Sequence, residues 1–298
     1  MKLKNSLASS TGKRDVSDLL DVNIGYLVWF TLTWGLGTWH CTFALAGNTN
    51  TTTIFEAKFG WDKDEAIFYN TIISTSAILG LSVGSFLGAS LLQYGRRRTA
   101  IIAHCMAIFG SCLSMVGTTP FLSIGRLFLG LAAGTANVVF GKMITETMPE
   151  KEASLFAMAH NAAICIGFIV AFGLAAFLPD PDDVEANKED EYWRLIYIFP
   201  AFVGLVEILL VLFVYRLEPV SYCIMTGRDE EGKAHMAKVY RKKDPNTPET
   251  IEQILDMQYT FMKKSTTMDA SSTSFKKAVC GAKYAKGTWV CFFINMFN

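Results

Sequence analysis

Six long apolar segments constrain the fold of this chain more than any other feature of its sequence. Each has about 20 mostly apolar residues, the length that an α-helix needs to cross the hydrocarbon core of a bilayer. Because 51% of the 298 residues are hydrophobic and only 18% are charged, the chain has more apolar surface than an ordinary soluble protein. The sequence therefore predicts an all-α membrane protein with spans at 24–46, 67–92, 100–119, 121–144, 154–178 and 194–215.

Composition and motifs exclude several other classes of protein. The 27 basic and 27 acidic residues give a formal net charge of zero, so we expect no nucleic acid partner. The seven cysteines form no CxxC pair, which argues against a zinc site or a disulfide framework. The sequence has no HExxH or P-loop motif and no paired carboxylates at hydrolase spacing. We therefore expect no enzyme, no metal site and no cofactor.

The distribution of basic residues predicts which side of the membrane each connection faces. Lys and Arg are frequent in the polar tail 1–23, at Arg96-Arg97-Arg98 and after residue 215, whereas residues 179–192 hold seven Asp or Glu and only Lys188. The tail has no apolar core or cleavage pattern of a signal peptide. Both ends of the six-span unit 24–215 are therefore predicted to be cytoplasmic.

Residues 47–66 are predicted to be an external loop between the first two spans. The loop contains Asn50-Thr51-Thr52, which is an acceptor sequence for N-glycosylation. An unused sequon in a Thr-rich solvated loop is the alternative. Asn50 is thus a candidate glycosylation site.

The polar segment 216–286 is predicted to be a cytoplasmic linker with amphipathic helices at 227–243 and 247–264. Thr247 is the expected N-cap of the second, because Pro248 and Glu249 follow it. That helix would pack its apolar face against the floor of the membrane domain, or else be a soluble tail helix of no special role. Residues 287–298 have the composition of a seventh span that stops after its first turns.

Polar and small residues inside the spans are candidates for function and for packing. Arg126 and Glu207 should face the protein interior or a water-filled cavity, because a charge in lipid is costly. Asn137 and Asn161 should hydrogen-bond a neighbour or a polar ligand. His40, His104 and His160 are interpreted as neutral core residues. Glycines at intervals of four predict close helix packing: Gly80, Gly84 and Gly88 in one span, and Gly130 and Gly134 in another.

Five short strings occur in the order and spacing of one family. They are Gly95-Arg96-Arg97-Arg98, Gly125-Arg126 continuing to Gly134, Glu146-Thr147-Met148-Pro149, Tyr192-Trp193-Arg194, and Leu217-Glu218-Pro219 with Tyr222. Together they resemble the sugar porter family of the major facilitator superfamily over about residues 24–298. The resemblance implies that family's amino-terminal half: a six-helix half-bundle of two inverted three-helix repeats, an architecture described for this superfamily, followed by its intracellular linker.

The resemblance also implies roles for single residues. Arg96, Arg97 and Glu146 match the charged residues that latch the cytoplasmic side in this family, and Glu218 would join them. The alternative is that they only anchor helix ends at the membrane surface. Asn161, six residues before Gly167, matches a glutamine that binds sugar hydroxyls, and Asn137 is the second candidate for substrate binding. Leu92, Gln93 and Ser221 depart from the latch pattern.

The implied function is transport of a hexose-like sugar or similar neutral polyol across a lipid bilayer. Gly37 stands where proton-coupled members carry an aspartate that pairs with the arginine matching Arg126, so we expect facilitated diffusion and not proton symport. The alternatives are a non-transporting membrane subunit and a sensor that signals through 216–286. A transporter would need a second half, from a longer chain, a second copy or a partner. The plasma membrane is the expected location.

Overall fold

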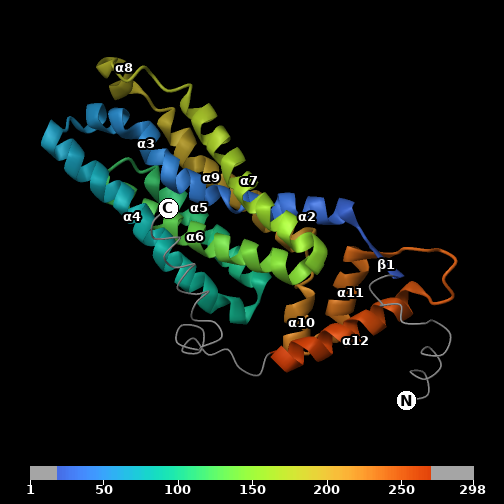
Figure 1. Ribbon diagram of the computed structural model, residues 1–298. Helices are drawn as coiled ribbons and strands as arrows, with labels where there is room; N and C mark the ends of the chain where they lie inside the picture. The colour runs from blue at the N-terminus through green and yellow to red at the C-terminus, as the bar shows by residue number, and fades with distance from the viewer. Residues whose placement is uncertain (1–18, 270–298) are drawn as a thin grey trace.

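The computed structural model describes residues 19–269, and most of them are helical (Figure 1). Residues 1–18 of the predicted tail, 270–286 of the predicted linker and the predicted seventh span at 287–298 lie outside the described residues. The helices of the bundle are α2 (Ile24–Leu36), α3 (Trp39–Phe59), α4 (Lys63–Leu91), α5 (Arg96–Ser114), α6 (Thr119–Thr147), α7 (Glu150–Ala175) and α9 (Trp193–Phe213). The other elements are strand β1 (Leu20–Val22), the 3-10 helix η2 (Leu92–Tyr94), α8 (Val184–Glu189), α10 (Val220–Thr226), α11 (Asp229–Val239), strand β2 (Tyr240–Lys242) and α12 (Ile251–Asp269).

The first predicted span is two helices, α2 and α3, instead of one. The chain turns at Gly37 and Thr38, where the Thr38 hydroxyl donates to the Gly35 carbonyl at 2.7 Å. After the turn, α3 continues through the Thr-rich stretch to Phe59, so the prediction of a loop at 47–66 is wrong. Helical hydroxyls there bond backbone carbonyls one turn earlier, as Thr51 does to Gly47 at 2.9 Å, and this makes a polar segment compatible with a helix.

The connection between α3 and α4 is only three residues long. Gly60, with a φ of 65°, ends α3 in the left-handed conformation that glycine adopts without strain. Asp62 begins α4 with a capping box, because its side chain accepts from the Glu65 backbone while the Glu65 side chain accepts from the Asp62 backbone. These local signals, and not the end of the apolar run, fix the boundary.

Four helices among the described residues are long and apolar enough to cross a membrane. They are Lys63–Tyr94, Thr119–Thr147, Lys151–Ala175 and Trp193–Phe213, and they correspond to four of the six predicted spans. Of the other two, the first is interrupted at Gly37, and the third, predicted at 100–119, lies in α5, which begins with three arginines and ends at Ser114. Large apolar side chains lie exposed on the outer helix faces, for example Trp29, Phe86 and Ile169, as expected where the surrounding medium is lipid.

Helices α4 and α6 pack backbone to backbone, as the glycine pattern predicts. A Cβ on Gly84 would lie 2.3 Å from the Leu131 carbonyl oxygen, and one on Gly134 would lie 2.1 Å from that of Leu81. Both distances are far below van der Waals contact, so only glycine permits this approach. Gly141, further along α6, has no atom within 4 Å of such a Cβ and takes no part in the contact.

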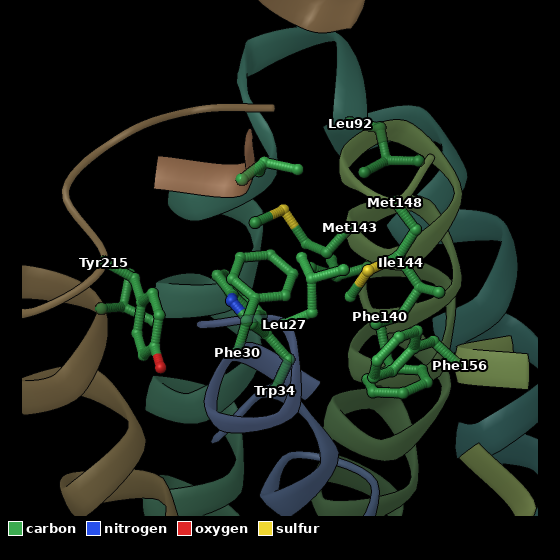
Figure 2. Packing of buried hydrophobic residues seen from close by; sticks show 14 residues of the cluster. Leu27, Phe30, Trp34, Leu92, Phe140, Met143, Ile144, Met148, Phe156 and Tyr215 are labelled. Carbon is green, nitrogen blue, oxygen red and sulfur yellow. The ribbon is translucent and has the colours of Figure 1, made fainter. Parts of the chain in front are cut away.

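An apolar cluster joins α2, α6, α7 and α9 at the end of the bundle nearest α10 and α11 (Figures 1 and 2). Phe30 and Trp34 of α2 lie beside Phe140 and Met143 of α6, and all four side chains are buried. Tyr215, just after α9, packs edge-on against Phe30 with ring centres 5.5 Å apart. The cluster holds the first and last predicted spans against the centre of the half-bundle.

A second, smaller core lies in the predicted linker. Ile254, Leu255 and Tyr259 of α12 pack with residues of α10, α11 and β1, so this face covers the other linker elements and not the floor of the membrane domain. Strand β1 pairs antiparallel with β2, with Leu20 opposite Lys242. Strand β2 takes the place of the end of the predicted helix 227–243. Part of the predicted amino-terminal tail is thus built into the linker.

The predicted N-cap of the last linker helix is also wrong. Helix α12 begins at Ile251, and Thr250 caps it: the Thr250 hydroxyl accepts from the Gln253 backbone while the Gln253 side chain accepts from the Thr250 backbone. This reciprocal pair is a capping box, which provides acceptors for two backbone N–H groups at the helix start. Thr247 lies three residues earlier, where its backbone N–H donates to Asp244.

Candidate functional site

The start of α5 carries a charged cluster that ties the bundle to the linker. Arg96 makes a two-pronged ion pair with Glu146 near the end of α6, with Nε 2.8 Å from one carboxylate oxygen and Nη2 2.7 Å from the other. Both side chains are largely buried. A parallel pair of charge-assisted hydrogen bonds is the strongest arrangement these groups form, and it fixes the angle between the two helices at this end.

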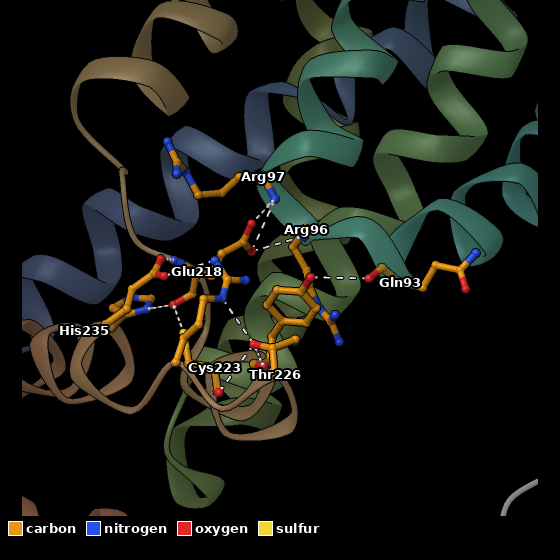
Figure 3. A network of polar contacts seen from close by, with 10 residues as sticks. Gln93, Arg96, Arg97, Glu218, Cys223, Thr226 and His235 are labelled. Atoms are coloured by element: carbon orange, nitrogen blue, oxygen red, sulfur yellow. Dashed lines mark hydrogen bonds and ion pairs between the residues drawn. The ribbon is translucent and has the colours of Figure 1, made fainter.

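Glu218 of the linker accepts the free backbone N–H groups at the same helix start. Its carboxylate lies 3.1 Å from the Arg96 nitrogen and 3.3 Å from that of Arg97 (Figure 3). An anion at a helix amino terminus is favoured by the unpaired N–H groups and by the helix dipole. Burial raises the pKa of the Glu218 carboxyl, and the two backbone hydrogen bonds oppose this rise.

Gly95 makes this contact possible. Its φ of 121° lies in a region that other residues rarely adopt, and a Cβ there would lie 2.8 Å from Glu218 Oε1. The glycine before the arginine string is therefore required both by the turn from η2 into α5 and by the carboxylate that closes over it.

Aromatic and polar linker residues complete the cluster. The Arg96 guanidinium lies over the Tyr222 ring, 4.2 Å from its centre, and the Tyr222 hydroxyl donates to the Gln93 carbonyl at 3.3 Å (Figure 3). His235 of α11 is within 2.7 Å of the Glu218 carbonyl through Nδ1 and within 3.2 Å of the Tyr26 hydroxyl through Nε2. These two partners favour a neutral ring with its proton on Nδ1. Burial lowers the pKa of His235 to about 4.

The structure thus brings all four predicted gate residues, Arg96, Arg97, Glu146 and Glu218, into one cluster. Their role as a gate stays a prediction. The sequence interpretation missed His235, because its partners Tyr26 and Glu218 are 209 and 17 residues away.

Arg126 is buried in the middle of the bundle and is held by backbone groups. Its guanidinium donates to the carbonyls of Phe43 at 3.0 Å and Ala44 at 2.5 Å, and it lies 5.7 Å from the centre of the Tyr197 ring. Among residues 19–269, no acidic side chain forms an ion pair with it. Two carbonyl dipoles and an aromatic face therefore surround the charge, as expected where no counter-ion is near.

Glu207 is also fully buried, on α9; its carboxylate lies beside a histidine, and neither oxygen has a hydrogen-bond partner among the described residues. Its Oε2 lies 3.2 Å from His104 Nε2, and His104 Nδ1 lies 3.0 Å from His40 Nε2. Sequence analysis assigned the two histidines only to the core. A signal that could have found them is the presence of three titratable residues, His40, His104 and Glu207, in three separate predicted spans.

The two candidate substrate residues lie on different helices. Asn161 is exposed on α7. Asn137 is half-buried on α6, where its side chain interacts with Cys41 of α3 and its Oδ1 has no hydrogen-bond partner among the described residues. Each offers amide groups to a ligand, but no measured contact joins the two side chains.

Asn50 is part of α3 and not of a loop, because that helix runs to Phe59. Its side-chain nitrogen is buried without a partner among the described residues. Glycosylation at Asn50 stays a prediction. An open groove of about 700 Å³ lies beside this stretch, between α3 and α4, and polar side chains such as Asn48, Asn70 and Ser74 line it.

Comparison with known families gives a match over most of the chain. The family model described as "Sugar (and other) transporter" matches residues 39–297. Hexose transporter 1 of Toxoplasma gondii is 28% identical over 243 residues, which are 75% of this chain and 42% of that protein. Hexose transporter 1 of Plasmodium falciparum is 27% identical over 66% of this chain and 43% of its own length. The chain thus spans about two fifths of these relatives.

Solved structures show the same fold. The proton:xylose symporter XylE, bound to 6-bromo-6-deoxy-D-glucose, superposes with a TM-score of 0.70 at 17% identity, over 88% of this chain and 56% of that one. A partially occluded inward-open form of XylE gives a TM-score of 0.68 over 82% of this chain and 60% of that one. The likeness confirms an all-α half-bundle of the major facilitator type. These relatives are transporters and not enzymes, as the sequence predicts. The chain is an integral, multi-pass membrane protein, and it belongs to the sugar transporter family of the major facilitator superfamily.

Proposed function

We propose that this chain forms one half of the membrane domain of a transporter that carries a hexose-like neutral sugar by alternating access. The observation that supports this most directly is the cluster around Arg96, which joins the bundle end to the linker through Glu146 and Glu218. Rocking of the bundle requires contacts at its ends that form in one state and break in another. A buried ion pair between two helices, covered by a separate linker element, has the chemistry for that role.

The orientation follows from the same cluster. The basic residues at 96–98 and in the linker favour a cytoplasmic location for this end of the bundle and for the amino terminus. The acidic segment that includes α8 then lies outside, and we assign the protein to the plasma membrane. An epitope tag at residue 2 should be reached by antibody only after permeabilisation. A tag inserted after Pro181 should be reached in intact cells.

A neutral sugar fits the polar groups that the bundle offers. Sugar hydroxyls need uncharged donors and acceptors in a mostly apolar cleft. Asn161 presents its amide on an exposed helix face, and Asn137 Oδ1 is an acceptor without a partner among the described residues. Two of the matching relatives are named hexose transporters and a third is named Myo-inositol transporter 3C, from Cryptococcus neoformans. We propose Asn161 as the main substrate residue and Asn137 as the second.

A second half-transporter should cover α7. This helix is among the most apolar, yet only 17% of its candidate span is buried, against 61% for α6. A helix that carries a substrate amide on its exposed face needs an opposing wall to form a cleft. That wall would come from a second six-helix unit, in the same polypeptide, a second copy or a partner.

Facilitated diffusion is the mechanism that the surroundings of Arg126 favour. Symport through an acid–arginine pair needs a carboxylate beside the guanidinium, and here Phe43 and Ala44 carbonyls take that place. Gly37 provides no such group. Sugar should therefore move down its own gradient without proton uptake through Arg126.

The test is sugar uptake by cells that lack their own hexose carriers. We expect saturable uptake with wild type, a raised KM with Asn161→Ala, and near wild-type uptake with Asn161→Gln, which keeps the amide. Ser82→Ala, at an exposed polar position on α4, is the control. Sugar binding to the purified chain without uptake would favour the sensor, and neither binding nor uptake would favour a non-transporting subunit. The intact mass of the native protein shows whether the second half belongs to the same polypeptide.

A further inference from the structure

Three titratable side chains from three helices form a line through the interior of the half-bundle. They are His40 of α3, His104 of α5 and Glu207 of α9, and none is more than 2% exposed. His40 Nε2 lies 3.0 Å from His104 Nδ1, and His104 Nε2 lies 3.2 Å from Glu207 Oε2. His104 therefore lies between a hydrogen-bonded ring on one side and a carboxylate on the other.

Three buried atoms of this group have no hydrogen-bond partner among the described residues: His40 Nδ1 and both carboxylate oxygens of Glu207. The contact of Glu207 Oε2 with His104 Nε2 is therefore an ion-pair distance without the alignment of a hydrogen bond. Among residues 19–269, no three His, Cys, Asp or Glu side chains converge on one point as metal ligands. The arrangement is a hydrogen-bonded pair of rings beside a buried carboxylate that has no hydrogen-bond donor among the described residues, so the group has places for one added proton.

Two protonation states fit these positions. In the first, both rings are neutral, one hydrogen bond joins His40 Nε2 and His104 Nδ1, and Glu207 is a carboxylate whose two oxygens accept no hydrogen bond from the described residues. In the second, one added proton lies on Glu207, where it removes the buried negative charge, or on His104 Nε2, where it places an imidazolium 3.2 Å from the carboxylate.

The surroundings leave this charge without a cation. Arg126 of α6 donates hydrogen bonds to the Phe43 and Ala44 carbonyls, which lie one turn beyond His40 on α3. The Tyr215 hydroxyl interacts with the charge of Glu207 and accepts a hydrogen bond from the Thr33 hydroxyl. Cys41 on α3 interacts with Asn137, and Tyr197 of α9 is bonded to Thr51. An unpaired carboxylate in such a site is costly, and chains of His and acidic residues inside membrane proteins are typical of proton relays.

The rings of His104 and His40 also lie beside the interruption between α2 and α3. A Cβ on Gly37 would lie 3.2 Å from His104 Cε1, and one on Gly204 of α9 would lie 3.6 Å from His40 Cε1. The rings therefore fill the space beside the point where the first predicted span turns. His40, His104 and Glu207 come from α3, α5 and α9. A change in the charge of this group therefore acts on the contact between these three helices.

We propose that His40, His104 and Glu207 form a site that binds one exchangeable proton and makes the rate of transport depend on pH. The proton-binding part stands on the geometry alone, and the transport part rests on the function proposed above. The site differs from an acid–arginine pair, because Arg126 takes no part in it.

Infrared difference spectroscopy tests proton binding directly. The purified chain in lipid nanodiscs is titrated from alkaline to acidic pH while the C=O band of protonated carboxyl groups is recorded. We expect a band that grows on acidification, is missing in Glu207→Gln, and titrates with a shifted midpoint in His104→Gln. His160→Gln removes a half-buried histidine on α7 that does not belong to the group of His40, His104 and Glu207. This variant should leave the midpoint unchanged. Glu207→Asp should restore a titrating band if the Gln variant folds poorly.

Uptake at a series of pH values separates this proposal from the proposed function. We expect the pH dependence of wild-type uptake to be lost in Glu207→Gln and kept in His160→Gln. Spectra of wild type and Glu207→Gln that coincide at all pH values would overturn the proton site, as would a midpoint that His104→Gln leaves unchanged. Uptake by Glu207→Gln with the wild-type pH profile would overturn its role in transport. A titrating Glu207 band in a protein without sugar uptake would refute the transport function and leave the proton site standing.

Discussion

The Glu218 carboxylate occupies the space where a side chain at position 95 would lie, with Oε1 2.8 Å from the position of a Cβ on Gly95. One residue of the linker and one residue of the turn before α5 therefore fit together only if the latter is glycine. The same carboxylate accepts the backbone N–H of Arg96 at 3.1 Å, so this fit also fixes the start of the helix. The attachment of the linker to the bundle depends on this pair.

Gly95→Ala should loosen that attachment. The substitution imposes a strained φ and displaces Glu218, and we expect a loss of about 1–3 kcal/mol in stability. Gly173→Ala in α7, where no atom lies within 4 Å of the new Cβ, is the matched control and should be neutral or slightly stabilising. Thermal unfolding in detergent measures both. Equal effects of the two substitutions would contradict the role given to Gly95.

Glu146→Gln should lower the stability of the folded protein more than the loss of an exposed ion pair does. It leaves the buried Arg96 guanidinium without its carboxylate, and removal of one partner of a buried pair costs about 3–5 kcal/mol. Lys233→Ala breaks the more exposed pair with Asp256 and should cost less than about 1 kcal/mol. Hydrogen exchange of residues 96–100 and 218–226 should rise in the first variant only. Unchanged exchange in Glu146→Gln would mean that the pair does not hold the linker.

Acidification should weaken the contact between α2 and α11. The folded pKa of His235 is about 4, below its ordinary value of 6.5, because the ring is buried. Between these values the unfolded chain binds a proton that the folded chain does not, so stability is full above about pH 6.5 and falls as pH drops toward 4. The raised pKa of the Glu218 carboxyl acts in the opposite sense, because that group gains a proton more readily when folded.

His235→Gln separates these two effects. The variant should lose stability at neutral pH, through the contact with the Tyr26 hydroxyl, and should show a smaller further loss on acidification than wild type. Thermal unfolding measured at intervals from pH 7 to pH 4 tests this. An identical pH dependence in both proteins would exclude His235 as its source.

Gly134→Val should prevent α4 and α6 from packing. The backbone of one helix lies where the new side chain would go, 2.1 Å from the Leu81 carbonyl oxygen, and no rotamer removes a clash of the Cβ itself. Gly141→Val on the same helix meets no atom within 4 Å and is the control. We expect the first variant to aggregate on extraction from the membrane and the second to elute as wild type does. Normal elution of Gly134→Val would contradict the close contact.

The sequence determined which segments are apolar helices, which glycines lie at a close contact, and which charged strings meet at one end of the bundle. These features depend on composition and on spacing within a segment, because a helix repeats its face every few residues. The interruption at Gly37, the helical course of 47–59, the strand pair Leu20–Val22 with Tyr240–Lys242 and the cap at Thr250 were not predicted. Each depends on hydrogen bonds that compete with the pattern that composition favours.

The tertiary structure alone decided which buried polar groups became partners. Arg126 could have met an acid, but its guanidinium lies against the Phe43 and Ala44 carbonyls. His104 could have been an isolated core residue, but the packing of α3, α5 and α9 places it between His40 and Glu207. A buried polar group takes whichever partner the packing of other helices brings within reach, and those partners are far away in the sequence. The pattern within one segment carries no record of that choice.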